Sequence, residues 1–441
     1  MFSRRELAKL VLPLVVELIF TALMGTADTM MVARVGDAAV SGVSLVDAVN
    51  NLMLMVFTAT ATGGTIVCAQ YLGAHDPAGA NRAARQVLLC VAVISLLCCG
   101  LCVACRRPLL RAVFGNVEDS VMDAGLTYFW VTALSYPFIG VYDASAALYR
   151  ASGDAKKPMI VSAIGNLLNI VGNAVFLFVF HWGVFGAALS TTLSRVFQCA
   201  VILILHRRPG QVIVLDRYAQ IRPDWRLIRA ILRVGIPTGV ENGMFQLGKL
   251  MVQSTVALLS TAEIAAQAVV NTMEYFTSMP SMAIGLGLVT VAGQCMGAGR
   301  PEEAKHYTLW FTVWSEILIL LTGIVIFLVV GPVCRASGLS EESSSVVFQT
   351  MLLITVVKPF VWPLAFTPPN AMRAAGDVKF SMLVSAGSMW IFRVALCVIL
   401  IRFLGFGILG VWIAMFVDWG NRSIWYTVRF FRGKWMKQRV L

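Results

Sequence analysis

Apolar stretches of roughly 20 residues or more recur along nearly the whole chain, and each is long enough to cross a bilayer as a helix. Only 13% of the residues are charged, whereas a globular protein needs about 25% to cover its surface. The sequence therefore predicts an all-α polytopic membrane protein and excludes a soluble enzyme or a nucleic-acid binder. Twelve transmembrane helices can be placed, at approximately 8–32, 42–70, 86–112, 122–149, 158–180, 184–206, 228–258, 264–296, 306–334, 344–371, 380–402 and 407–430.

The basic residues are distributed unevenly between the two predicted sides of the membrane. The termini and every second loop carry most of the lysines and arginines. The opposite loops carry only Arg34, Arg106, Arg107, Arg111, Arg335 and Arg402. Because positive residues favour the cytoplasmic side, both termini are predicted to be cytoplasmic. The short termini and compact loops favour a plasma membrane, specifically a bacterial inner membrane. We expect a monomer in the lipid bilayer, with no nucleic-acid partner.

The two halves of the sequence repeat each other. Three uncommon motifs recur at a shift of 223 or 224 residues: Pro13-x-x-x-Glu17 as Pro237-x-x-x-Glu241, Gln70-x-x-Gly73-Ala74-x-x-Pro77 as Gln294-x-x-Gly297-Ala298-x-x-Pro301, and Arg150-Ala-x-Gly-Asp154 as Arg373-Ala-x-Gly-Asp377. So many uncommon residues in register indicate a duplication. Each half holds six predicted spans, an even number, so both halves enter the membrane from the same side. We expect two pseudo-symmetric six-helix bundles, as in parallel-repeat transporters. The predicted parts are an N-lobe at 1–206, a cytoplasmic linker at 207–226 and a C-lobe at 227–441.

Polar side chains on three helices of the N-lobe reach a similar predicted depth. By the rise of an α-helix, Asp28 lies ~28 Å beyond Lys9, and Asn173 and Thr191 each lie ~24 Å from the basic end of their own helix. Asn169 lies one turn from Asn173. A carboxylate, two amide oxygens and a hydroxyl are ligands that a hard cation such as Na⁺ prefers, and a buried carboxylate can instead carry a proton. The alternative is interhelical hydrogen bonding that only holds the bundle together.

A second group of polar residues is predicted on the seventh span. Glu241, Gln246, Lys249 and Gln253 share one helical face, and Glu17 shares a face of the first span with Asp28. Ionisable residues also occur in neighbouring spans, at Lys358, Arg393 and Asp418. One interpretation is a substrate-binding or second charged site. The other is a set of buried structural ion pairs, and the sequence favours neither.

The chain resembles the multidrug and toxic compound extrusion (MATE) family of transporters. The residues that carry the resemblance are Pro13 with Asp28, the Gln70-x-x-Gly73-Ala74 and Gln294-x-x-Gly297-Ala298 motifs, the paired Arg-x-x-Gly-Asp loops and Asn169-x-x-x-Asn173. The resemblance implies two six-helix lobes around a cleft. It also implies export of organic cations against entering Na⁺ or H⁺, with Asp28, Asn169 and Thr191 in the family's aspartate, asparagine and threonine positions.

Two positions depart from the family's pattern. Asn173 stands where many members carry an acid, which lowers the negative charge of the site. Phe245 stands where Na⁺-coupled relatives carry a seventh-helix glutamate, and Glu241 comes one turn earlier.

We therefore expect a secondary active antiporter that exports small organic cations by alternating access, with no cofactor other than the coupling ion, H⁺ or Na⁺. A possible Na⁺ would bind at Asp28, Asn169, Asn173 and Thr191. The alternative within transport is a flippase of a lipid-linked precursor or polysaccharide from the same superfamily, for which Lys249, Lys358 and Arg393 would supply a cationic cavity. We do not expect an enzyme, because no nucleophile or metal constellation is present in the spans.

Overall fold

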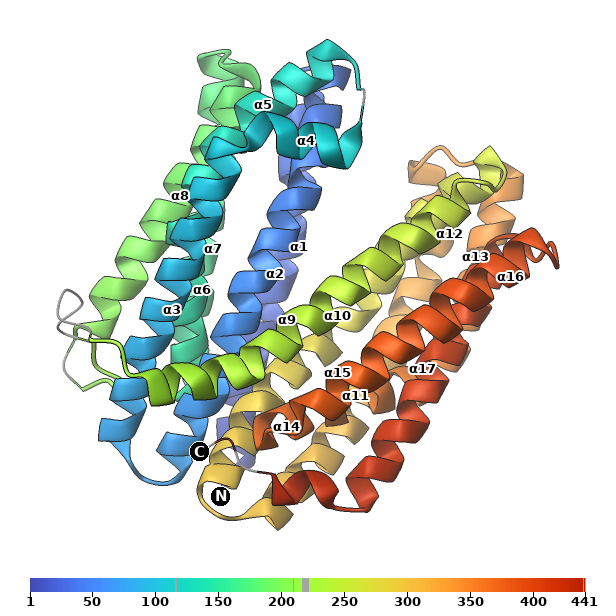
Figure 1. Cartoon of the computed structure of the whole chain (residues 1–441). Coiled ribbons are helices and arrows are strands. Elements are labelled where there is room, and N and C mark those ends of the chain that lie inside the picture. The colour runs from blue at the N-terminus through green and yellow to red at the C-terminus, as the bar shows by residue number, and fades with distance from the viewer. Residues whose placement is uncertain (116, 209, 216–221, 439, 441) are drawn as a thin grey trace. The chain divides into compact units, whose positions relative to one another are not determined.

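Every regular element that the computed structural model describes is a helix (Figure 1). The structure describes residues 1–441 except 116, 209, 216–221, 439 and 441. Within the described residues, nine helices are long and apolar enough to cross a membrane, or ten if α5 and α6, which are bent by 49°, form one span. The all-α polytopic class predicted from the sequence is confirmed.

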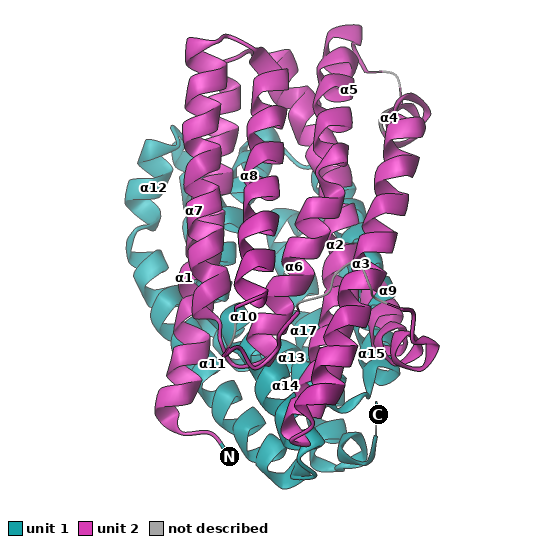
Figure 2. Ribbon diagram, turned by 90° about the vertical axis from the view of Figure 1, so that its left-hand side faces the viewer, with its two compact units in different colours: residues 1, 240–441 teal, residues 2–239 magenta. Residues whose placement is uncertain are grey.

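Residues Phe2–Gly239 form one compact unit, coloured magenta in Figure 2. Its first helix, α1 (Arg4–Ala33), begins after Ser3, whose hydroxyl accepts from the Glu6 backbone N–H in a capping box. Within this unit α1 packs on α7 and α7 packs on α8, while α2 packs on α3, α5 and α6. The other helices of the unit are α2 (Asp37–Gly73), α3 (Pro77–Ala104), α4 (Arg106–Phe114), α5 (Asp119–Leu134), α6 (Tyr136–Ala151), α7 (Lys156–Asn173), the π-helix η1 (Ala174–Val179) and α8 (Gly183–His206).

Residues Val240–Leu441, with Met1, form the other compact unit. Within it α10 packs on α11, α13 and α14, and α13 packs on α17. Its apolar core includes Trp412 and Trp419 of α17 and Trp362 of α13. The helices of this unit are α10 (Thr261–Gly297), α11 (Pro301–Leu328), α12 (Val330–Ala336), α13 (Glu341–Phe366), α14 (Pro368–Ala375), α15 (Val378–Ser388), the π-helix η3 (Met389–Ala395), α16 (Leu396–Arg402), α17 (Gly407–Phe431) and the 3₁₀-helix η4 (Lys434–Lys437).

The division between the units falls inside α9 (Trp225–Val256), between Gly239 and Val240. The sequence places the N-lobe at 1–206, the linker at 207–226 and the C-lobe at 227–441. Part of that linker, residues 209 and 216–221, lies outside the described residues. These domain boundaries stay a prediction.

Each predicted span coincides with one helix or with a run of consecutive helices. The predicted stretches 86–112, 122–149 and 306–334 are each broken into two helices, at Cys105, Ser135 and Val329. Two helices at predicted spans, α9 and α17, are not among the nine apolar ones. Apolar content therefore predicts where the chain crosses a membrane but not where its backbone breaks.

The repeated Gln-x-x-Gly-Ala motif ends a helix in the same way in both halves. At the end of α2 the Ala74 N–H donates to the Gln70 carbonyl, and at the end of α10 the Ala298 N–H donates to the Gln294 carbonyl, both at 2.9 Å. One residue later in each turn the backbone is left-handed, with φ of 58° at His75 and 69° at Gly299. The next helix then begins at a proline, which needs no N–H partner.

Candidate ion-binding site

Asp28 and Asn173 are brought together by the packing of α1 on α7. The Asn173 side-chain amide donates to Oδ1 of Asp28. Asn173 is fully buried and Asp28 is half-buried. The Asn173 carbonyl oxygen, Oδ1, is also buried, and among the described residues it accepts no hydrogen bond. This pair therefore offers a carboxylate and a buried amide oxygen that is available to a cation.

Asn169 and Thr191 are joined in the same way between α7 and α8. Nδ2 of Asn169 donates to Oγ1 of Thr191 at 3.2 Å. The Asn169 main-chain carbonyl accepts from the Ser190 hydroxyl at 2.8 Å, which fixes α8 against α7. Asn169 lies one turn from Asn173 on α7. The four residues that the sequence grouped by depth thus form two hydrogen-bonded pairs within one unit.

A second carboxylate, which was not predicted from the sequence, is Asp47 on α2; it is close enough to Asp28 for the two charges to repel. Oδ1 of Asp47 accepts from Nδ2 of Asn50 at 3.3 Å. The side-chain oxygen of Asn50, Oδ1, accepts from the Tyr136 hydroxyl at 2.7 Å. Tyr128 is buried close to Asp47. An ionisable residue inside the predicted span 42–70 was the signal that could have identified Asp47.

Arg195 on α8 supplies the positive charge nearest to the two carboxylates. It attracts both Asp28 and Asp47, and its Nη1 donates to the Ser135 hydroxyl at 2.7 Å at the bend between α5 and α6. The site therefore holds two carboxylates against one guanidinium. A net negative, partly buried group of oxygen ligands is suited to binding a proton or a hard monovalent cation.

Glu17 and Glu241, which the sequence assigned to a substrate or second charged site, each form an ion pair with the arginine of the repeated loop motif. Oε2 of Glu17 lies 3.8 Å from Nη1 of Arg150 in one unit. Oε1 of Glu241 lies 3.2 Å from Nη2 of Arg373 in the other. In each repeat, the glutamate of the Pro-x-x-x-Glu motif thus pairs with the arginine of the Arg-Ala-x-Gly-Asp motif.

The remaining residues of the predicted polar face on α9 are not joined by hydrogen bonds. Within the described part of the chain, neither the Gln246 nor the Gln253 side chain forms one, and Lys249 lies over the ring of Phe245. Glu274 on α10, which was not predicted from the sequence, pairs with Lys358 on α13 at 2.5 Å.

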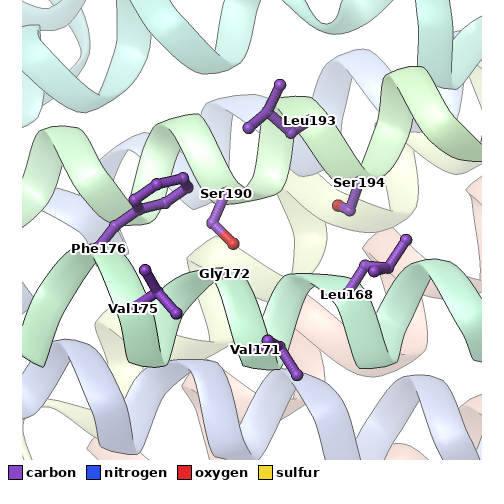
Figure 3. A pocket seen from close by; sticks show the side chains of 8 residues that line it. All are labelled: Leu168, Val171, Gly172, Val175, Phe176, Ser190, Leu193 and Ser194. Atoms are coloured by element: carbon purple, nitrogen blue, oxygen red, sulfur yellow. The ribbon is translucent and has the colours of Figure 1, made fainter. Parts of the chain in front are cut away.

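A pocket of about 300 Å³ lies between α7 with η1 and α8 (Figure 3). The Ser190 side chain, which holds α7 through Asn169, lines it. Its other walls are mostly apolar side chains that are largely exposed on the surface of the unit, such as Leu168, Val171 and Leu193. The pocket does not include Asp28, Asn169, Asn173 or Thr191, so it is separate from the candidate ion-binding site.

The MatE family profile matches the chain twice, at residues 13–175 and at residues 237–399. The chain belongs to the MatE family. Both ends of the two matches are offset by 224 residues (13 to 237, 175 to 399), which agrees with the shift of the repeated motifs. The family match therefore confirms both the duplication and the resemblance to the MATE family.

Relatives of the chain match it over nearly its whole length. The probable multidrug resistance protein NorM of Thermotoga maritima is 28% identical over 99% of this chain and 94% of its own. The multidrug and toxin extrusion protein 1 of Danio rerio is 23% identical over 98% of this chain and 72% of its own. The solved outward-facing structure of a multidrug resistance MATE family transporter of the MOP superfamily has a TM-score of 0.90 at 18% identity, and covers 97% of this chain and 96% of its own.

Membership in this MatE family has three consequences. The chain is an integral membrane transporter and not an enzyme. MATE transporters bind drug-like substrates. They couple transport to H⁺ or Na⁺.

Proposed function

We propose that this MatE-family chain is a secondary active antiporter that exports organic cations in exchange for H⁺ or Na⁺ by alternating access. The observation that carries the proposal is the Asp28–Asn173 pair, in which a carboxylate adjoins a buried amide oxygen without a hydrogen-bond partner. Asn169, Thr191 and Asp47 surround this pair. The multidrug names of the relatives support the class of substrate.

In the proposed mechanism, Asp28 holds either the coupling ion or the cationic cargo, but not both. Binding of H⁺ or Na⁺ neutralises Asp28 and removes the charge that attracts an organic cation, so the cargo is released. Pro13 lies inside α1 and interrupts its hydrogen-bond ladder, so a bend of α1 there would be the movement coupled to the charge of Asp28. One charge moving down 100 mV supplies roughly 2.3 kcal/mol for this exchange.

The orientation and setting are also proposals. We place both termini in the cytoplasm, because the loops on that side carry most of the basic residues. The relatives from Thermotoga maritima and Bacillus subtilis support a bacterial plasma membrane, and we propose the inner membrane of a bacterium. We propose that a single chain carries out transport.

The test is efflux of a fluorescent organic cation from liposomes that contain the purified chain. A pH gradient and a Na⁺ gradient are imposed separately, on the wild type and on Asp28→Asn. Asp123→Asn on α5 is the matched control, because it removes an exposed aspartate from the same unit. We expect efflux under one of the two gradients, its loss in Asp28→Asn and its retention in Asp123→Asn. Efflux at the wild-type rate in Asp28→Asn would overturn the proposed coupling role.

A flippase of a lipid-linked precursor or polysaccharide is the second candidate function. The observation that favours it is the presence of Lys249 and Arg393 in the C-terminal unit without ion-pair partners within 4.0 Å among the described residues, because such cargo is anionic. Translocation of a labelled lipid-linked precursor in the same liposomes, with no efflux of organic cations, would favour the flippase.

A further inference from the structure

Three cationic side chains surround the ring of Phe245 in the unit Val240–Leu441. Nζ of Lys249 lies 5.3 Å from the ring centroid, Cζ of Arg393 lies 5.4 Å from it and Cζ of Arg422 lies 5.8 Å from it. The three residues come from α9, η3 and α17, so packing of three separate helices brings them together. We call Lys249, Arg393 and Arg422 the cationic cluster.

The cationic cluster has a surplus of positive charge. Arg422 pairs with Asp418, whose Oδ1 accepts from Nε at 2.8 Å. Arg393 is 5% exposed, and its one hydrogen bond among the described residues is to the Met389 sulfur, at 3.6 Å. Lys249 forms no hydrogen bond or ion pair within the described part of the chain. Counted with Lys358, four cations thus face two carboxylates, Asp418 and Glu274, of which Glu274 is paired with Lys358.

Aromatic rings alone do not offset this surplus. Arg393 also lies over Trp419 and Arg422 over Phe366, at 5.9 and 5.7 Å. The attraction of one cation to one ring is weaker than the loss of hydration when an ion leaves water. Arg393 is attracted by Asp418 and Glu274 and repelled by Lys249 and Arg422. An additional anion beside this buried guanidinium would therefore stabilise it.

The unused hydrogen-bonding groups around the cluster are mostly donors. Nη2 of Arg422 and Nε1 of Trp419 are buried and have no partner among the described residues. One acceptor, Oδ2 of Asp418, is also buried without a partner. Arg393 lies on η3, a π-helix. Such segments are rare in proteins, and those that do occur are often found at functional sites. Lys249 is exposed, which leaves one edge of the cluster open to a ligand.

From this geometry we propose that the cationic cluster is a binding site for the oxyanion, a carboxylate or phosphate, of an amphipathic ligand. Lys249 and the two guanidiniums bind the oxygens, as charged donors do most strongly. Phe245 and Trp419 contact the apolar part of the same ligand. The site lies in the unit that does not contain Asp28. The proposal does not depend on the coupling role of Asp28.

The test measures binding of tritiated 2-naphthoate to the purified full-length chain in nanodiscs of phosphatidylcholine. The neutral amide, 2-naphthamide, has the same rings without the charge and is the matched ligand control. We expect Lys249→Gln and Arg393→Gln to weaken naphthoate binding roughly ten- to a hundredfold, the loss typical of a charged hydrogen bond. Lys249→Arg should retain it.

Arg402→Gln is the matched protein control, because Arg402 is an exposed arginine of the same unit, at the end of α16. It should bind naphthoate as the wild type does. Since Lys249 is exposed, Lys249→Gln should fold even if Arg393→Gln does not. Asp28→Asn should also bind naphthoate normally, which separates this proposal from the antiport proposal. Equal binding of naphthoate and naphthamide, or wild-type binding of naphthoate by both glutamine variants, would overturn it.

A second set of nanodiscs, which contain phosphatidylglycerol, identifies the source of the oxyanion. If phosphatidylglycerol displaces naphthoate from the wild type and is retained less by Lys249→Gln, the natural occupant is a lipid phosphate. If it does not compete, the occupant is a soluble amphipathic anion. Both results support an oxyanion site. Absence of both naphthoate binding and phosphatidylglycerol retention in the wild type would contradict it.

Discussion

At the scale of single residues, the side chain of Asn173 sets the charge beside Asp28. As an amide it donates to the Asp28 carboxylate and turns its own oxygen inward without a partner. An acid at this position would add a third carboxylate to the site that holds Asp28 and Asp47. A bound cation would be held more strongly by the added charge. Two unit charges about 4 Å apart interact by about 4 kcal/mol at an effective dielectric constant near 20.

We therefore expect Asn173→Asp to bind Na⁺ more tightly than the wild type, by about tenfold or more once repulsion between the carboxylates is included. Because a ligand that binds only the folded state stabilises it, the variant should melt at a higher temperature in NaCl than in choline chloride. Thermal unfolding in detergent measures this difference. Asn173→Ala removes the amide without adding charge and should show no such gain. An equal response of Asn173→Asp and Asn173→Ala to Na⁺ would contradict the predicted role of charge at this site.

Asp47 should act together with Asp28, because the two carboxylates are close enough to repel and share the attraction of Arg195. We expect Asp47→Asn to lower gradient-driven cation efflux by roughly tenfold. The double variant with Asp28→Asn should be no worse than Asp28→Asn alone, since residues of one site are not additive. Efflux assays on the four proteins test this, with Asp123→Asn as the exposed control. Strictly additive losses would mean that the two carboxylates act separately.

The candidate ion-binding site could be predicted only in part from the sequence. Helical rise gave the depths of Asp28, Asn173 and Thr191, because depth along a straight helix depends on sequence alone. Asp47 was missed because its approach to Asp28 depends on how α2 packs in its unit. The partners of Glu17 and Glu241 were missed for the same reason, since Arg373 lies 132 residues from Glu241 along the chain.

At the scale of elements, the two glutamate–arginine pairs hold the first helix of each repeat to the last helical turn of its fourth span. The four side chains are 11–21% exposed. Partly buried pairs lose more than exposed ones when a single partner is removed, because the other charge stays buried.

We expect Glu241→Gln and Arg373→Gln to be non-additive, with a coupling energy of about 1–2 kcal/mol, and Glu17→Gln with Arg150→Gln to behave alike. Double-mutant cycles on thermal stability in detergent measure both couplings. The Arg300–Glu303 pair, 58% and 34% exposed, is the control and should give about 0–1 kcal/mol. If the coupling energies of the two interhelical pairs are no larger than that of this surface pair, these pairs do not stabilise the helix packing within each repeat.

Gly153, in the turn before α7, adopts a φ of 85°, and a Cβ added there would meet no atom within 4 Å. Any cost of Gly153→Ala is therefore backbone strain, about 1–2 kcal/mol for the left-handed region. Gly420 in α17 is the matched control: it also has open space around it, but its helical φ suits alanine. Gly420→Ala should stabilise by about 0.5–1 kcal/mol. A lower melting temperature for Gly153→Ala and a higher one for Gly420→Ala would support the assignment to backbone strain. A lower melting temperature for both variants would indicate side-chain crowding at Gly420.

The breaks within spans were the part of the fold that the sequence did not predict. The bend between α5 and α6 is at Ser135, whose hydroxyl donates to the Thr132 carbonyl and accepts from Arg195 on α8. A contact with a distant helix thus stabilises the bend, and hydropathy does not record such contacts. The span positions were predictable because the bilayer imposes the same length on every crossing helix.

At the scale of the whole molecule, the duplication makes a definite prediction about topology. Gly115 and Gly338 stand at corresponding loops of the two repeats, each with a φ of 66°, and Gly153 and Gly376 stand at another corresponding pair. If each repeat has six spans, the members of a pair lie on the same side of the membrane. The positive-inside rule puts Gly153 and Gly376 in the cytoplasm, beside Arg150 and Arg373.

Fusions of green fluorescent protein and of alkaline phosphatase after each of these four glycines test both statements. We expect fluorescence and no phosphatase activity after Gly153 and Gly376, and the reverse after Gly115 and Gly338, because the phosphatase is active only outside the cytoplasm. A fusion at the C-terminus should be fluorescent and is the control for orientation. Opposite results within a pair would indicate an inverted repeat, whereas reversal of all the results together would preserve the parallel repeat and reverse only the predicted orientation.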